Sequence, residues 1–587
     1  MNSPDPLLWG EPAGSSAGFF TSSPRSRPPT NKHGYSPVRT HEKQKPNSSS
    51  LDYALPPNPA DWGALSLYLT DPESDDYLHN PDPVRDYKND YGARICTRRG
   101  LANLGCMMIV LLGCLLLFAV YPVVLHFTKK PLSNYNAFNV GGLNASGQIP
   151  SMLGSFGLID VDTPKSVYTK PSYTNPNEEM DLVFSDEFNV GGRTFWPGDD
   201  PYWEAPSLHY WATNDLEWYD PAAVTTQGGA LRITLSEVDP ASNHNLKYRS
   251  GMFCFTGGII EAAVVLPGSS NVHGLWPAIW TMGNLGRAGY GATLDGLWPY
   301  SYDSCDVGTL PNQTFPGTAK PEAATKNGDP AHGGVLSYLP GQRLSACTCS
   351  GESHPGPVHQ NGQSVGRSAP EIDIFEATVD FGVGKVSQSA QIAPFNEGYR
   401  LANTSANLKI YDPEATLLNP YIGGAYQQTL SGLSVTNPEC YELNKGCYSV
   451  YAFEYKPGFD DAYITWVNGG KPAWTLMASA IGSEKQTEIG ARAISQEPMY
   501  IIANLGFSTN FGGIDFGHIQ LPATMLIDYI RVYQPKNGRN IGCDPPGFPT
   551  ATYIKTYAEA YNNPNITEWG HPIFNQSMPK NRLNGGC

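Results

Sequence analysis

A chain of 587 residues is too long for one hydrophobic core, so we expect tails and an anchor besides one large globular unit. The chain holds 61 Gly and 51 Pro, and 11% of its residues are aromatic, which favours a loop-rich all-β protein over a helical bundle. The formal net charge of −16 argues against a nucleic-acid partner, because phosphate binding needs a basic surface.

Residues 1–100 are polar, and their first part is rich in Pro and Ser without a periodic apolar pattern. Such a stretch buries too little apolar surface to offset chain entropy, so we predict a disordered tail. An uncharged apolar run follows at Leu104–Leu125. As a helix rising about 1.5 Å per residue, it is long enough for a hydrocarbon core of about 30 Å. The alternative for this run is a buried core helix.

The charges beside this run predict its orientation. On its C-terminal side lie only Lys129 and Lys130, whereas the basic residues on its N-terminal side are Arg85, Lys88, Arg94, Arg98 and Arg99. By the positive-inside rule we expect a signal anchor at 101–127 and a cytosolic N-terminus. The chain would then be a single-pass type II protein of a secretory-pathway or plasma membrane, with its bulk in the lumen or outside the cell.

Cysteines and glycosylation sequons fit a lumenal location. Cys440 and Cys447 are close enough in sequence to close a small loop, whereas the other pairings stay open. The Cys347-x-Cys349 pair lacks neighbouring metal ligands, so we expect disulfides and no metal. The cysteines after the anchor are even in number: Cys254, Cys305, Cys347, Cys349, Cys440, Cys447, Cys543 and Cys587. The sequons, which are surface glycan sites if lumenal, are Asn144, Asn312, Asn403, Asn565 and Asn575.

After a predicted Asn/Gly/Ser/Pro-rich stalk at 128–176, the segment 177–535 alternates short β-branched and aromatic runs with Gly, Pro and Asn turns. These runs predict antiparallel strands with one buried face, in a concanavalin-like β-jelly-roll sandwich. We expect a disulfide-tied insertion at about 283–370 and a Cys-containing extension at 536–587. The predicted strands are Leu231–Leu235, Ile259–Leu266, Glu371–Val379, Ser449–Tyr455, Ala462–Gly469, Tyr500–Gly506 and Met525–Gln534.

Three acids lie in one predicted strand, Glu371-Ile-Asp-Ile-Phe-Glu376, and they indicate a catalytic site. Glu371 and Asp373 share a strand face, and one β-bulge near Ile374–Phe375 would bring Glu376 to the same face. The backbones of Glu371 and Glu376 would then lie ~13 Å apart. Side chains that lean together approach the roughly 5–5.5 Å carboxyl separation of a retaining glycosidase. The alternative is an exposed acidic edge that discourages aggregation.

The E-x-D-x-x-E pattern resembles the laminarinase-like signature of glycoside hydrolase family 16. Flanking blocks are similar to that family in its order, over roughly residues 180–535. They are LVFSDEFN (Leu182–Asn189), YRSGMF (Tyr248–Phe253), GLWPAIWTMG (Gly274–Gly283), ITWVNG (Ile464–Gly469) and DYIRVYQ (Asp528–Gln534). With the anchor, the insertion and the tail Cys543–Asn565, the chain resembles the fungal β-glucan-synthesis-associated type II membrane proteins, a branch linked to β-1,6-glucan assembly and cell-wall organisation.

The resemblance implies roles for the acids: Glu371 as nucleophile, Glu376 as general acid/base, and Asp373 as a hydrogen-bond partner that tunes the nucleophile. Substrate-binding candidates are Trp276 and Trp280, which could equally be core residues, and Asn504. Hydrolytic relatives often carry a His on the strand after the motif, where this chain has Gln388–Gln391. That departure favours transglycosylation or a changed substrate.

Three functions stay open. The first is a retaining β-glucan hydrolase or transglycosylase, with β-1,3- or β-1,6-glucan and the membrane as partners and with no cofactor. The second is a non-catalytic glucan-binding scaffold. The third is a lumenal assembly factor for glucan synthesis. The three carboxylates favour the enzyme.

Overall fold

The computed structural model describes residues 83–84, 87, 98–121, 157–197, 199–200, 202–238, 252–253 and 258–587. Nearly all of the predicted tail and residues 128–156 of the predicted stalk, together with Asn144 and Cys254, lie outside the described residues, whereas residues 157–176 are described and contain a short strand, Thr169–Pro171. Helix α3 covers Arg98–Leu115 and continues as a π-helix over Leu116–Val120. No helix in the described ranges combines the length and the apolar character that a membrane crossing requires. The anchor expected at 101–127 stays a prediction.

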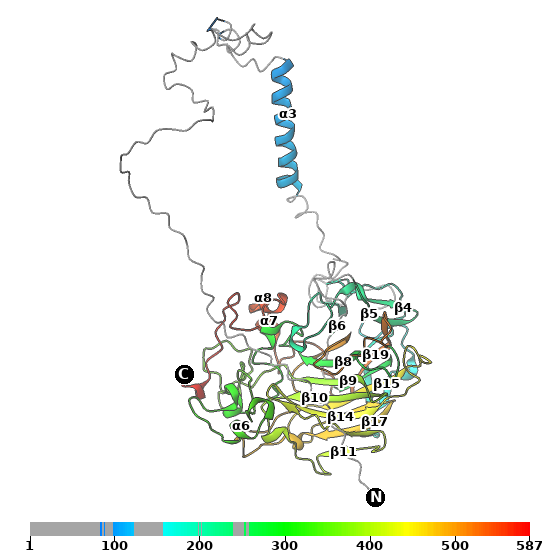
Figure 1. Cartoon of the computed structure of the whole chain (residues 1–587). Coiled ribbons are helices and arrows are strands. Elements are labelled where there is room, and N and C mark those ends of the chain that lie inside the picture. The colour runs from blue at the N-terminus through cyan, green and yellow to red at the C-terminus, as the bar shows by residue number, and fades with distance from the viewer. Residues whose placement is uncertain are drawn as a thin grey trace, which may run out of the picture. The chain divides into compact units, whose positions relative to one another are not determined.

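Two antiparallel sheets form the centre of the segment 157–587 (Figure 1). The seven-stranded sheet holds β12 (Thr416–Leu418), β14 (Gln427–Val435), β10 (Val383–Ile392), β9 (Glu371–Asp380), β8 (Trp276–Gly283) and β18 (Met499–Gly506) in that order, with β13 (Gly423–Gly424) paired to β14. Because β9 lies in the interior of this sheet, both of its edges are hydrogen-bonded to neighbours.

The ten-stranded sheet begins and ends with short strands. Its order is β1 (Thr169–Pro171), β2 (Glu179–Asp186), β19 (Ala523–Pro535), β7 (Gly258–Val265), β15 (Ser449–Lys456), β16 (Tyr463–Asn468), β17 (Lys471–Met477) and β11 (Leu408–Ile410), while β5 (Ala230–Leu235) pairs with β19 and with β4 (Val224–Gln227). A separate ribbon pairs β3 (Trp203–Glu204) with β6 (Met252–Phe253). All seven strands predicted from alternation are confirmed, within two residues at their ends.

The core lies between the two sheets. Ile372 and Phe375 of β9 pack in one apolar cluster with Ile260 of β7 and Phe453 of β15, and none of the four exposes more than 2% of its surface. Burying such a side chain stabilises the fold by about 1.5–3 kcal/mol. The predicted two-sheet sandwich is therefore confirmed.

Long segments outside the sheets form a second packed region. Residues 284–370, which connect β8 to β9, contain α5 (Gly291–Leu294) and α6 (Ala323–Lys326), and the C-terminal extension contains α7 (Ala551–Thr556) and α8 (Ala558–Asn562). Trp569 of the extension packs in one buried cluster with Leu297 of the connection and Met282 of β8. The extension therefore supports the segment that follows β8.

Disulfides tie these segments together. Cys305 pairs with Cys347 inside the connection, Cys349 pairs with Cys587 at the end of the extension, and Cys440–Cys447 closes the small loop that the sequence predicted. Disulfide formation is thus confirmed for these cysteines. Four sequon residues have exposed side chains, as a glycan site requires: Asn312, Asn403, Asn565 and Asn575.

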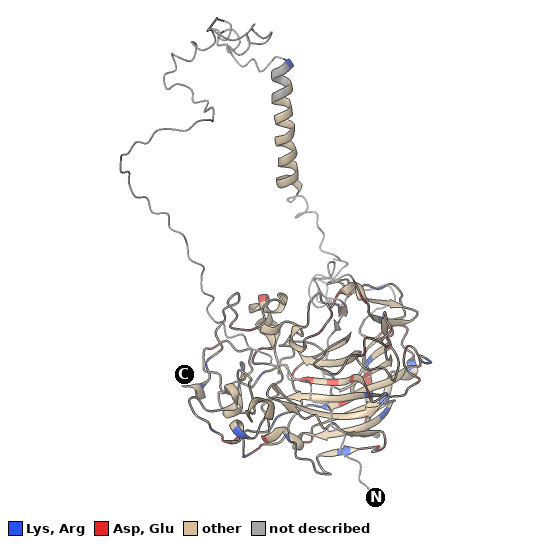
Figure 2. Cartoon of the chain, viewed as in Figure 1, with Lys and Arg blue, Asp and Glu red and all other residues tan. Residues whose placement is uncertain are grey.

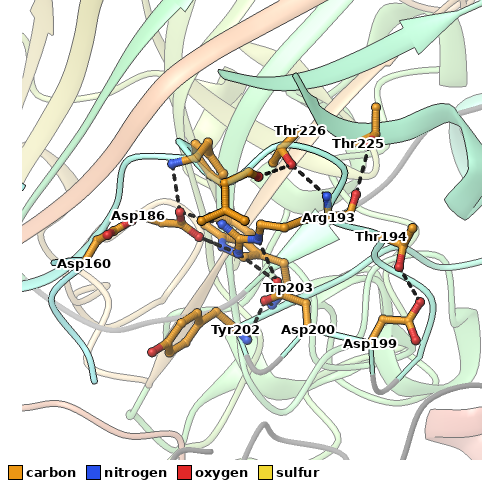
Figure 3. Close-up of polar contacts among 12 residues, drawn as sticks. Asp160, Asp186, Arg193, Thr194, Asp199, Asp200, Tyr202, Trp203, Thr225 and Thr226 are labelled. Atoms are coloured by element: carbon orange, nitrogen blue, oxygen red, sulfur yellow. Dashed lines mark hydrogen bonds and ion pairs between the residues drawn. The ribbon is translucent and has the colours of Figure 1, made fainter. Parts of the chain in front are cut away.

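A buried charge cluster follows β2 (Figure 3). The Arg193 guanidinium donates to both carboxylate oxygens of Asp186 at 2.8 Å, and its Nε and Nη2 donate to Asp200 at 3.0 and 2.7 Å. Trp203 Nε1 also donates to Asp186, at 2.6 Å. Burial raises the pKa of Asp200, and the charge of Arg193 opposes that rise. Arg193 therefore joins the end of β2 to the loop that leads into β3.

Candidate active site

The pairing of β9 with β8 shifts by one residue in the middle of the strand. Phe375 lies opposite Ile279 and Asp373 lies opposite Trp280, so Ile374 is one residue more than β8 provides. The pairing of β9 with β10 also slips by one residue over the same stretch. A β-bulge therefore interrupts the pleat, and the bulge predicted from the sequence is confirmed.

This bulge brings the three acids to one side of the sheet. Ile374 and Phe375 are adjacent, yet both are fully buried in the core between the sheets. Because a regular pleat would turn one of them outwards, the bulge restores Glu376 to the side that carries Glu371 and Asp373. Figure 2 shows acidic positions along β9.

Two side chains from the core side hold the bulged backbone. Trp466 Nε1, on the ten-stranded sheet, donates to the Asp373 carbonyl oxygen at 2.8 Å. Gln388 Nε2 donates to the Ile374 carbonyl oxygen at 3.1 Å and to Val467 O at 2.9 Å. An unpaired buried carbonyl would be costly, so these bonds stabilise the irregular pairing. Gln388 therefore has a structural role on the core side, whereas Ser389 and Gln391 of the same stretch contact Asp373.

Each glutamate accepts a hydrogen bond from an indole. Trp298 Nε1, from the connection between β8 and β9, donates to Glu371 Oε2 at 2.7 Å. Trp276 Nε1, on β8, donates to Glu376 Oε1 at 3.1 Å. Both glutamates keep partial solvent exposure. A donated N–H favours the ionised carboxylate, so the two indoles orient the glutamates and oppose the rise of their pKa values.

Asp373 lies between the two glutamates and is almost fully buried, at 1% exposure. Its Oδ2 accepts hydrogen bonds from Ser389 Oγ at 2.7 Å and from Gln391 Nε2 at 3.1 Å, and Thr429 in turn donates to Gln391 Oε1. The hydrogen bond expected between Asp373 and Glu371 is absent from the contacts of the described residues. Asp373 instead acts on Glu371 through its charge.

Burial raises the pKa of all three acids. The pKa of Glu376 rises to about 8, with the charge of Asp373 adding to the effect of burial, and the pKa of Asp373 rises to about 7 despite its two donors. The pKa of Glu371 lies well above its usual value because burial and the charges on Asp373 and Glu376 outweigh the bond from Trp298. At neutral pH Glu376 therefore keeps its proton, as a general acid requires, whereas burial and the neighbouring charges oppose the ionisation of Glu371.

The predicted sugar-stacking residues lie beside the acids. Trp276 is partly buried and stacks on Phe511, with ring centroids 4.3 Å apart and planes at 5°. Trp280 is also partly buried and packs on the cluster that the C-terminal extension completes, and its Nε1 donates to Asn504 Oδ1 at 2.9 Å. Asn504 lies opposite Ala278 of β8, and Ala278 lies opposite Glu376. The structure therefore brings all six predicted site residues to one face.

A buried group of polar residues behind Asn504, which includes Asp215 and Glu217, was not predicted from the sequence. Asn504 Nδ2 donates to Tyr219 Oη at 3.3 Å, and Tyr219 Oη donates to Asp215 at 2.8 Å. Glu217 beside them has no exposed surface, and burial raises its pKa well above the usual value. The alternating pattern of Asp215-Leu-Glu217-Trp-Tyr219 was the available signal. These residues hold the Asn504 amide and, through it, Trp280.

Other partners of the acids also went unpredicted. Trp298 lies 73 residues before Glu371 in a segment without regular structure, so no local pattern pairs the two. The contacts of Ser389 and Gln391 with Asp373 could have been predicted, because polar residues at alternate positions of a strand beside an acidic strand can face its carboxylates.

Comparisons with known proteins identify relatives over most of the chain. The family model for "Beta-glucan synthesis-associated protein SKN1/KRE6/Sbg1" matches residues 65–587. The protein KRE6 of Saccharomyces cerevisiae is 40% identical over 579 residues, which cover 95% of this chain and 75% of that protein. The protein SKN1 of Candida albicans is 40% identical over 533 residues, 88% of this chain and 67% of its own. Both carry the name beta-glucan synthesis-associated protein.

Solved structures that align with part of this chain include endo-β-1,3-glucanases. The catalytic domain of the laminarinase from Thermotoga petrophila aligns with a TM-score of 0.34 and 18% identity, over 61% of this chain and 100% of that chain. The endo-β-1,3-glucanase of Pyrococcus furiosus aligns with a TM-score of 0.34 and 17% identity, over 63% and 98% of the two chains.

Proposed function

Because the chain belongs to the beta-glucan synthesis-associated SKN1/KRE6/Sbg1 family, we propose that it works on cell-wall β-glucan as a retaining glycosidase or transglycosylase. The observation that carries this proposal is the bulge of β9, which turns Glu371, Asp373 and Glu376 to one face. The raised pKa of Glu376 supplies the protonated group that a two-carboxylate mechanism needs.

In the first step of this mechanism, a Glu371 oxygen attacks the anomeric carbon of the glucan. Glu376 gives its proton to the departing glycosidic oxygen, and a covalent glycosyl ester on Glu371 results. In the second step, Glu376 takes a proton from an incoming hydroxyl group, whose oxygen displaces Glu371 and keeps the β configuration. Water as the incoming group gives hydrolysis, and a sugar hydroxyl gives transfer.

Trp298 and Asp373 would control the charge on the nucleophile. Attack needs Glu371 ionised, and Trp298 Nε1 donates to that carboxylate. Protonation of Glu376 and Asp373 removes the repulsion that raises the pKa of Glu371. In this account, the proton that Glu376 needs as an acid also favours the negative charge that Glu371 needs.

We favour transfer between glucan chains over hydrolysis, with a contribution to β-1,6-glucan biosynthesis and fungal cell-wall organisation. The name shared by the relatives refers to synthesis. The test is incubation of the protein with β-1,3- and β-1,6-gluco-oligosaccharides, with the Glu376→Gln variant as control. Products longer than the donor are expected from the wild type alone. Binding without any product would support the second candidate, a non-catalytic scaffold or assembly factor.

The scaffold candidate has one observation in its favour. Trp298 lies directly on Glu371, so the approach of a sugar to this carboxylate requires space beside the indole. The oligosaccharide assay separates the two functions, because a scaffold binds glucan and leaves its length distribution unchanged.

We also propose a lumenal or extracellular location for the β-sandwich, with 101–127 as the anchor. Disulfides persist in oxidising compartments, and this part of the chain holds three of them. Exposed Asn403 and Asn565 lie in sequons that only lumenal enzymes can glycosylate. A mobility shift after endoglycosidase treatment is expected, and its absence would contradict this location.

A further inference from the structure

Aromatic side chains gather beyond β14, on the side of the seven-stranded sheet away from β18. His332 and Tyr338 come from the connection between β8 and β9, and Tyr421 and Tyr426 come from the segment between β12 and β14. The His332 ring lies edge-on to Tyr338 and Tyr426, with ring centroids 5.1 and 6.0 Å away. Tyr338 and Tyr426 are 5.9 Å apart. We call these four residues the aromatic cluster.

The rings of the aromatic cluster are fixed in place but not covered. Tyr338 is 37% exposed and Tyr421 is 45% exposed. Asp329 bonds the His332 ring at 2.7 Å, and the Tyr338 amide donates to the Ala425 carbonyl at 2.8 Å. Single exposed aromatic residues are common, whereas a group held by such contacts suggests a binding surface.

The register of the sheet relates the aromatic cluster to the acids. Glu371 lies opposite Gln391 of β10, and Gln391 lies opposite Thr429 of β14. The Thr429 amide donates to the carbonyl oxygen of Ile422, the neighbour of Tyr421. The row from Glu371 to the Tyr421 segment therefore spans three strand spacings, about 14 Å.

The charge of Glu376 also contributes to the pKa of Tyr421. Surrounding protein raises its pKa although its side chain stays exposed, and the charges of Asp329 and Glu376 add to this rise. Because the Tyr421 ring is 45% exposed and its segment lies three strand spacings from Glu371, it offers a face to a ligand that continues from the acids.

We propose that the aromatic cluster is a second sugar-binding site, which holds a β-glucan chain several sugar units away from the unit at Glu371 and Glu376. This inference rests on the proposed function. Aromatic faces pack on the apolar C–H faces of sugar rings, and the hydroxyl groups of tyrosines and the imidazole of His332 bond sugar hydroxyls. A disaccharide at the acids is too short to reach the cluster, so the site serves long chains only.

The test compares short and long ligands on the full-length protein. Every variant carries Glu371→Gln, so that binding is measured without turnover. The Tyr338→Ala/Tyr421→Ala double variant is expected to bind long β-1,3- or β-1,6-gluco-oligosaccharides about 10-fold more weakly, with affinity for the disaccharide unchanged. The matched control is Tyr448→Ala, because Tyr448 is 40% exposed and precedes β15 of the other sheet.

Each outcome is decisive for the aromatic cluster. Equal affinity of the double variant and the control for long chains would overturn the second site and leave the proposed function intact. Failure of the Glu371→Gln parent to bind any glucan, with unchanged thermal unfolding, would overturn the second site together with the proposed function.

Discussion

The indole of Trp466 donates a hydrogen bond across the sandwich to the main-chain carbonyl of Asp373, with 2.8 Å between nitrogen and oxygen. Trp466 belongs to β16 of the ten-stranded sheet, and Asp373 belongs to the bulge that brings the acids together. Trp466 stacks on Trp474, with ring centroids 4.1 Å apart. This bond thus joins the ten-stranded sheet directly to the backbone of the candidate site.

Replacing Trp466 by Phe keeps an aromatic ring but leaves the Asp373 carbonyl unpaired. We expect this variant to lose about 1–3 kcal/mol of unfolding free energy for that bond, besides the loss of packing, and to lose activity as the bulge relaxes. The matched control is Trp474→Phe, because Trp474 Nε1 is buried and has no hydrogen-bond partner among the described residues. Denaturant unfolding and glucan turnover measure both effects, and equal losses in the two variants would contradict this role.

Replacing Trp298 by Phe removes the donor to Glu371. The pKa of Glu371 should rise further, so the acidic limb of the pH profile of kcat/KM should move to higher pH, with kcat/KM about 10-fold lower. Replacing Trp276 by Phe removes the donor to Glu376 and should move the basic limb instead. An unchanged acidic limb in Trp298→Phe would argue against Glu371 as the ionised group.

The raised pKa of Glu376 predicts a pH dependence of stability. The folded state keeps this proton up to a pKa of about 8, whereas the unfolded state releases it near its usual value of about 4.3. Stability should therefore fall as pH rises from about 4.5 to 8. Glu376→Gln should become more stable relative to the wild type over that range.

The matched control is Glu322→Gln: Lys326 lowers the pKa of exposed Glu322, so this group is ionised in both states from pH 5 to pH 8 and its stability gap to the wild type should stay constant. Unfolding curves at pH 5 and pH 8 measure the difference. A constant stability gap between wild type and Glu376→Gln would contradict the raised pKa.

Arg193 forms a buried ion pair and Arg539 forms an exposed one, so substitutions at the two positions compare the contributions of the two kinds of pair to stability. Replacing Arg193 by Met leaves the Asp186 and Asp200 carboxylates buried and uncompensated, so we expect a loss of about 3–5 kcal/mol in unfolding free energy. Replacing Arg539 by Met breaks a surface pair with Asp181 and should change stability by less than about 1 kcal/mol. Similar losses for both variants would show that the cluster of Figure 3 contributes little.

The features that could be predicted from the sequence are those with a local pattern, namely the strands and the bulge in β9. Alternation located the strands, and the five-residue separation of Glu371 and Glu376 required the bulge that β9 has. Long-range contacts leave no such local pattern. Trp298 meets Glu371 across 73 residues and Trp466 meets Asp373 across 93, so their roles appear only in the folded chain.

The role of Gln388 could be interpreted only once its contacts in the fold were known. In the sequence it belongs to the stretch Gln388–Gln391, which departs from a family pattern that bears on turnover. In the fold its amide bonds the carbonyl of bulge residue Ile374, which makes it part of the support for the acids. The absence of a His at that point is therefore compatible with an intact acid row.

Covalent labelling of Glu371 tests the central proposal most directly. The full-length protein would be incubated with a 2-fluoro β-glucosyl probe, digested and analysed by mass spectrometry. We expect one glycosyl adduct, located on Glu371 and absent in Glu371→Gln, because the fluorinated ester forms faster than it breaks down. No adduct on a folded, glucan-binding wild-type protein, or an adduct on Glu376 instead, would contradict the assignment of Glu371 as nucleophile.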